Sequence, residues 1–336
     1  MKETTLRSMA SAARCGTRIL GVALFVAYAA PALAVDLGDY GPIRDGFNNF
    51  LGHISTLTSA ALAAPGYADG VDMMFWAFVS ILVIRIMVKF ALSGVTMLEI
   101  LEAVLNIFTT RALMVTYNTL TSAIWDIGVG VGAAIQSAMI GTSDLFFGPA
   151  FIAQLIGNIS MPDASWTSVA QIANAVIASL VLGLVSLVLG ALSFLVSIWG
   201  VWGYALAKIV GYLFLPFLVF ERLMFLFDGW LRFFLGFVVY MIVARVNTVL
   251  VVAALALYFG FPFPPSIAGM PPIVIPSISS LVELLGLFCF ALIGIVALLS
   301  TGRFAATILA GAGGGGFGLA LQSATRAVAK MALAAG

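Results

Sequence analysis

The sequence predicts an all-α fold, a polytopic bundle of transmembrane helices. Hydrophobic residues make up 62% of the 336 positions and charged residues only 9%, against about 25% charged residues in ordinary soluble domains. A soluble protein of this length needs more polar surface to stay in water, and disordered chains are rich in charge and poor in apolar residues. The composition therefore argues strongly against a soluble enzyme and excludes a disordered chain.

The N-terminal region has the layout of a secretory signal peptide over residues 1–34. Four basic residues precede an apolar run at 19–30, and Ala32-Leu33-Ala34 is a small-x-small cleavage site. The alternative is that the apolar run stays as an uncleaved first membrane helix. The segment 35–71 and the following Asp72 together carry five Asp and one Arg. Because cytoplasmic loops are the ones enriched in Lys and Arg, we expect a periplasmic N-terminus.

Five apolar runs are long enough to be membrane spans, which need about 20 residues to cross about 30 Å of hydrocarbon. They cover residues 72–90, 172–199, 201–220, 230–259 and 282–299, with Gly200 and Gly203 expected at the turn between the second and third. Five spans from a periplasmic N-terminus place the C-terminus in the cytoplasm. Basic residues in the segment that follows the last span agree with this orientation. The sequence thus divides into a transmembrane core, 172–303, and a Gly/Ala-rich tail, 304–336.

A sixth span is the open question of this topology. Polar residues recur every three or four positions between 95 and 117, which predicts an amphipathic helix that completes the region 72–117 with the first span. This helix lies on the inner surface or crosses the membrane. No Lys or Arg occurs from 112 to 207, which favours a periplasmic central apolar loop at 118–171 and a crossing helix. Six spans, however, would put the C-terminus outside, and one long hairpin or a re-entrant segment between residues 172 and 220 would reconcile the two signals.

Few residues offer chemistry. Arg245 lies near the middle of the fourth apolar run, and because a charge at membrane depth is costly, we expect it to face protein or water. The two cysteines, Cys15 and Cys289, and the single His53 make no set of metal ligands. The sequence also lacks the paired acidic or histidine motif of a membrane-embedded enzyme. We therefore expect a non-enzymatic protein without metal or cofactor.

One stretch goes beyond composition. Within residues 199–246, Gly211 precedes a Leu-Pro-Phe element that contains Pro216 and Phe217, and Trp230 opens the next apolar run. This arrangement resembles the core of the TrbL/VirB-type polytopic inner-membrane subunit of bacterial type IV secretion (conjugation) systems, and the resemblance extends more loosely over 72–303. Pro216 is expected to kink its span, because proline removes a helix hydrogen bond. Trp230 is expected to anchor the following span at the membrane interface.

The resemblance implies a structural and conduit subunit of the bacterial inner membrane that supports pilus biogenesis and the passage of DNA or protein. It also implies pilin, minor pilin, assembly ATPase, inner-membrane and core-complex proteins as partners, and a homo-oligomeric ring. The central loop would contact partners or substrate. The candidate contact residues in it are Trp125, Asp126, Asp144, Phe146, Phe147 and Trp166. The alternative function is a secondary transporter or permease, which would have inverted repeats and paired broken helices.

Overall fold

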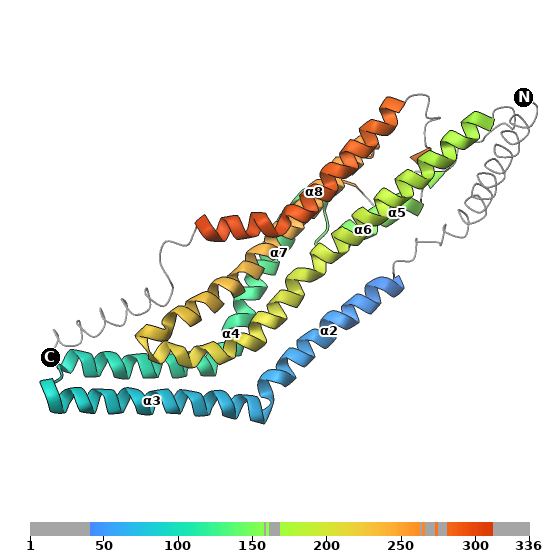
Figure 1. Cartoon of the computed structure of the whole chain (residues 1–336). Helices are drawn as coiled ribbons and strands as arrows, with labels where there is room; N and C mark the ends of the chain where they lie inside the picture. The colour runs from blue at the N-terminus through green and yellow to red at the C-terminus, as the bar shows by residue number, and fades with distance from the viewer. Residues whose placement is uncertain are drawn as a thin grey trace, which may run out of the picture. The chain divides into compact units, whose positions relative to one another are not determined.

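The computed structural model describes residues 41–157, 159–160, 169–262, 264–265, 273–274 and 281–311. Almost all of them are helical, as the sequence predicted (Figure 1). The helices are α2 (Gly41–Ala63), α3 (Pro65–Ser93), α4 (Met97–Ile140), α5 (Phe147–Gly157), α6 (Val169–Gly211), α7 (Met224–Tyr258) and α8 (Leu281–Gly311). Two 3₁₀ helices, η1 (Tyr212–Val219) and η2 (Glu221–Leu223), join α6 to α7. The proposed signal peptide, Trp166 and the tail beyond Gly311 lie outside the described residues.

A short parallel strand pair is the exception to the helical class. Strand β1 (Ile159–Ser160) pairs with β2 (Ile273–Val274), with Ile159 opposite Ile273. At two residues each, these strands are too short to form a sheet with a core of its own. The fold class therefore remains a helical bundle.

The chain divides into two compact units. Of the described residues, those within 41–43, 146–194 and 249–297 form the α5 unit, and those within 44–145, 195–248 and 298–311 form the α4 unit. In the α5 unit, a Cβ atom added at Gly294 of α8 would lie 3.2 Å from Leu189 of α6 and 3.3 Å from Val251 of α7. This glycine therefore lets three helices approach closely, as small residues do in membrane bundles.

In the part of the chain that the structure describes, five helical stretches are long and apolar enough to cross a membrane, which is consistent with a multi-pass membrane protein. They are Pro65–Ser93, Met97–Ile140, Gly183–Val219, Glu221–Tyr258 and Phe288–Leu309. Three of them contain most or all of the expected runs 72–90, 230–259 and 282–299. The other two differ from the sequence-based assignment, for reasons that the glycine contacts explain.

The expected turn between residues 199 and 201 is wrong, because α6 continues without a break to Gly211. Gly200 and Gly203 lie inside this helix and face α7. A Cβ at Gly200 would lie 2.5 Å from the sulfur of Met241, and one at Gly203 would overlap the ring of Phe237. These glycines make room for α7 rather than for a turn, so the expected spans 172–199 and 201–220 belong to one helix and its 3₁₀ extension.

The expected central loop, 118–171, is wrong for residues 118–140, which complete the 44-residue helix α4. Gly128 and Gly132 lie in this part of α4 and are buried against α7. A Cβ at Gly128 would overlap Val238, and one at Gly132 would lie 2.9 Å from Cδ of Arg245. The spacing of these two glycines is the small-xxx-small pattern of close helix packing.

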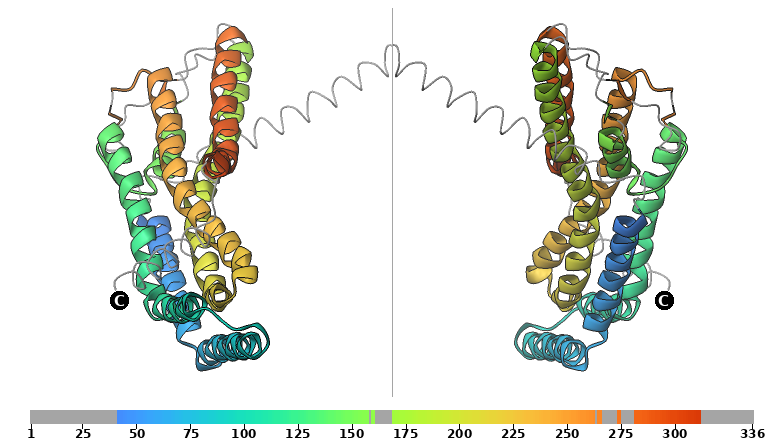
Figure 2. Two further views of the ribbon diagram at one scale, coloured as in Figure 1. Left: turned by 90° about the vertical axis from the view of Figure 1, so that its left-hand side faces the viewer. Right: turned by 90° about the vertical axis from the view of Figure 1, so that its right-hand side faces the viewer.

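Helix α3 and the first part of α4 form an antiparallel hairpin within the α4 unit (Figures 1 and 2). Gly94 ends α3 with a positive φ of 76°, a conformation that favours glycine. Two salt bridges join the helices: Lys89 Nζ lies 2.7 Å from Glu99 Oε2, and Arg111 Nη1 lies 2.7 Å from Asp72 Oδ1. The expected amphipathic helix 95–117 is therefore the first part of α4, with charges paired to α3.

Candidate functional site

The end of α6 is the first part of the candidate site. The α-helix ends at Gly211 and continues as the 3₁₀ helix η1, with Pro216 inside it and buried. Proline has no backbone N–H to donate, so a regular α-helix cannot run through this position undisturbed. The last carbonyls of an α-helix also lack partners within the helix and need donors from elsewhere.

Aromatic side chains from three other helices supply those donors. They bond to three consecutive backbone carbonyls, those of residues 207–209. The bonds run from Trp230 Nε1 to Ala207 O at 2.8 Å, from Tyr117 OH to Lys208 O at 2.7 Å, and from Tyr67 OH to Ile209 O at 2.5 Å. We call Tyr67, Tyr117 and Trp230 the α6 clamp, because they tie α3, α4 and α7 to the end of α6.

The residues of the secretion-type pattern lie at this clamp. A Cβ at Gly211 would overlap the indole ring of Trp230, whose side chain is buried. Phe217 of η1 packs on Phe78 of α3 with ring centroids 5.4 Å apart, and Phe78 adjoins the same apolar core as Trp230. Pro216, which lies between Gly211 and Trp230 in the sequence, is buried in η1. Trp230 is thus an interior packing residue. An interfacial anchor would instead have its ring on the outer surface of the bundle.

Arg245 of α7 is the second feature of the site. It is only 8% exposed, and its Nη1 donates to Gln136 Oε1 at 3.0 Å and to Ser143 O at 2.9 Å. Gln136 in turn donates to the backbone oxygen of Asp144, whose carboxylate attracts the guanidinium. Gly132 leaves the space in which the arginine side chain lies. The charge expected to face protein therefore does so, and Nε has no hydrogen-bond partner among the described residues.

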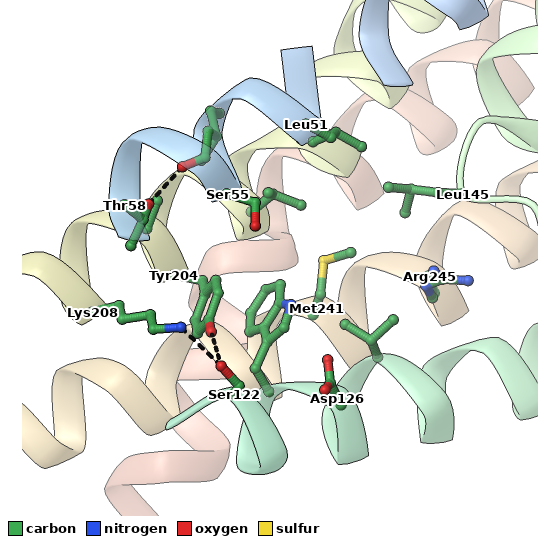
Figure 3. Close-up of a pocket in the computed structure, with 15 residues that line it drawn as sticks. Leu51, Ser55, Thr58, Ser122, Asp126, Leu145, Tyr204, Lys208, Met241 and Arg245 are labelled. Atoms are coloured by element: carbon green, nitrogen blue, oxygen red, sulfur yellow. Dashed lines mark hydrogen bonds between the residues drawn. The ribbon is translucent and has the colours of Figure 1, made fainter. Parts of the chain in front are cut away.

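A cavity of about 380 Å³ lies within the α4 unit, lined by α2, α4, α6 and α7 (Figure 3). We call it the Lys208 cavity. Lys208 is 7% exposed, and its Nζ donates to Ser122 Oγ at 2.8 Å and lies 5.5 Å from the ring centroid of Tyr204. Tyr204 stacks on Trp125 at 4.3 Å. Arg245 also lines the cavity, so the lining includes two cationic side chains.

Three of the six predicted partner contacts are buried inside the chain, and Asp144 is half-buried. Trp125 is 8% exposed in its stack with Tyr204, and Phe146 and Phe147 are buried in the α5 unit. These three aromatic side chains therefore pack within the single chain rather than on a surface that a partner or substrate could reach. Asp126 is exposed and lines the Lys208 cavity.

Several residues of the site carried no usable signal in the sequence. Tyr67 and Tyr117 are ordinary aromatic residues in apolar helices, and their carbonyl partners are 142 and 91 positions away. Gln136 and Ser122 are isolated polar residues. The one readable signal was the spacing of Gly128 and Gly132, which indicates close helix packing and would have extended α4 through this region.

Among the residues described by the structure, no three His, Cys, Asp or Glu side chains gather as a metal site would require. In comparisons with known proteins, no family model and no curated protein matches the chain.

Proposed function

We propose that the chain is a structural and conduit subunit of a type IV secretion system in the bacterial inner membrane. It supports pilus biogenesis and the passage of DNA or protein, and it has no enzymatic role. One observation carries the proposal: Gly211 and Trp230, which match the secretion-type pattern, are in direct contact at the α6 clamp, with Pro216 and Phe217 in the adjoining η1. Residues that match a family pattern and also pack together form a structural unit. A chance resemblance between apolar sequences would not require the matching residues to be in contact.

The proposed partners are pilin, minor pilin, assembly ATPase, and other inner-membrane and core-complex proteins, around a homo-oligomeric ring. The exposed faces of the helices support a membrane-embedded assembly. Large apolar side chains such as Met73, Leu92 and Phe108 are mostly exposed in the single chain. Such surfaces require lipid or neighbouring subunits to cover them.

Affinity purification from the membranes of the native host tests this function. We expect the tagged chain to co-purify with pilin, assembly ATPase and core-complex subunits after mild detergent extraction. A homogeneous particle without these partners that also takes up a solute saturably in proteoliposomes would overturn the proposal. That result would favour the secondary transporter.

Substitutions separate the role of the site from that of membrane insertion. We expect Arg245→Ala and Trp230→Ala to reduce substrate transfer or pilus formation more than Arg85→Ala, since Arg85 is exposed on α3. Each variant is compared at equal membrane abundance, measured by immunoblot. Normal transfer in both buried-site variants would remove the case for these residues.

A further inference from the structure

The cation of Lys208 is buried, and no carboxylate of the described residues lies within salt-bridge distance of it. Its side chain is 7% exposed, and among the described residues it takes part in no salt bridge. The Nζ atom has three donor hydrogens, and one of them is used by Ser122 Oγ at 2.8 Å. Buried charges in proteins are normally paired, so this ammonium group has both the charge and the donors to bind an anion.

Hydroxyl groups surround the same end of the Lys208 cavity. The hydroxyls of Ser122 and Tyr204 lie beside Lys208 Nζ, and Ser55 of α2 faces the same space (Figure 3). A hydroxyl can rotate its hydrogen toward an acceptor. Together with an ammonium group, these donors suit the oxygens of a phosphate ester, because charge-assisted hydrogen bonds are the stronger kind.

The other charged groups of the cavity select the charge of the ligand. Arg245 adds a second cation, but its Nη1 already bonds to Gln136 and Ser143. Asp126 adds a carboxylate one turn of α4 beyond Ser122. The lining therefore has a formal excess of one positive charge, which fits a phosphodiester with one negative charge better than a dianion.

The remaining wall and the depth of the cavity fit a lipid. Leu51, Val129 and Val201 are among the apolar side chains that line it. Lys208 follows Ala207, which is bonded to Trp230, and Trp230 lies two residues from the charged Asp228 on one side and Arg232 on the other. Because charged residues of a membrane helix concentrate at its ends, these side chains indicate that Lys208 lies at headgroup depth.

We propose that the Lys208 cavity binds one phospholipid of the surrounding membrane. Lys208, Ser122 and Tyr204 hold its phosphodiester, and the apolar wall holds the start of an acyl chain. The inference does not rest on the secretion function, since a membrane protein with any activity could carry such a site. Its failure would therefore leave the proposed function untouched.

The test uses the full chain, purified and delipidated in a zwitterionic detergent. Binding of dioleoyl phosphatidylglycerol is measured by native mass spectrometry and by the shift in thermal unfolding. We expect Lys208→Met to weaken binding by about tenfold or more, the effect of losing a charged hydrogen-bond donor. Lys208→Arg should keep most of the binding. Lys89→Met, which removes an exposed cation of α3, is the matched control and should bind like the wild type.

Two further arms keep the result decisive. Ser55→Leu fills the cavity from α2 without removing Lys208, and we expect it to reduce lipid binding even if Lys208→Met fails to fold. Glycerophosphoglycerol and inorganic phosphate are titrated as soluble probes, and both should bind more weakly than the lipid. Equal lipid binding by the wild type and a folded Lys208→Met, unchanged binding by Ser55→Leu, or soluble probes that bind as tightly as the lipid would each overturn the proposal.

Discussion

The indole ring of Trp230 occupies the space that a side chain at Gly211 would need. The same ring donates from Nε1 to Ala207 O, one turn before the glycine. Gly211 itself has an ordinary helical φ of −65°, so its backbone does not require glycine. A glycine fits at position 211 because the Trp230 ring of α7 packs directly on it. The small residue and the large one are therefore complementary in size.

Gly211→Ala should therefore destabilise the protein. The added methyl group would overlap the Trp230 ring, and we expect the free energy of unfolding to fall by about 1–3 kcal/mol, as overpacking does. Denaturant titration in detergent measures the change. Gly229→Ala is the control, because no atom lies within 4 Å of a Cβ there. Equal effects of the two substitutions would contradict the pairing.

Trp230→Phe tests the hydrogen bond apart from the packing. The phenyl ring keeps most of the aromatic contact but removes the indole hydrogen bond to Ala207 O, and we expect a loss of about 1 kcal/mol in the free energy of unfolding. Trp199→Phe, at a position 51% exposed, should change it by a few tenths of a kcal/mol at most. The same unfolding titration compares them, and a neutral Trp230→Phe would show that the ring alone matters.

A double-mutant cycle tests the contact between Arg245 and Gln136. Because their side chains are hydrogen-bonded and buried, we expect Arg245→Met and Gln136→Leu to be non-additive by about 0.5–3 kcal/mol. The control cycle replaces Arg245→Met with Arg85→Met, whose exposed side chain lies on α3. Additive effects in the first cycle would mean that the bond contributes no coupling energy.

Nitroxide scanning along α4 tests whether residues 118–140 are helical. In a chain with both native cysteines replaced, labels at exposed positions should collide with dissolved oxygen more often than labels at buried ones, because a helix repeats every 3.6 residues. The exposed set is Ala123, Ile127 and Ala134, and the buried set is Thr121, Trp125 and Gln136. Oxygen accessibility from electron paramagnetic resonance should oscillate between them. A flat profile would restore the loop.

The sequence predicted the helical class and most of α3, α7 and α8, because long apolar runs with few charges have few other solutions. It also singled out Arg245, since an isolated charge in such a run needs a partner. It was wrong about the turn at Gly200 and about the loop over residues 118–140, where Gly128 packs on α7. A glycine can end a helix or admit a neighbouring one, and only the facing residues, Met241 and Val238, decide between these roles.

The clamp could not be predicted for a different reason. Its bonds join positions far apart in the chain, as Tyr67 and Ile209 show, and the acceptors are backbone oxygens that any residue type supplies. Those oxygens lie near the end of α6, shortly before the change from α to 3₁₀ geometry at Gly211. Pro216 indicated that the helix would be disturbed, but the sequence around it did not indicate which side chains would donate to the carbonyls.

The clamp also has a mechanical consequence. A sliding movement of α6 along its axis would break the bonds to Tyr67, Tyr117 and Trp230 together, at about 0.5–1.5 kcal/mol for each. At this level α3, α4, α6 and α7 are therefore expected to shift as one rigid body. Any opening and closing during a working cycle would have to occur at less firmly held parts, such as the exposed helix α2 over the Lys208 cavity.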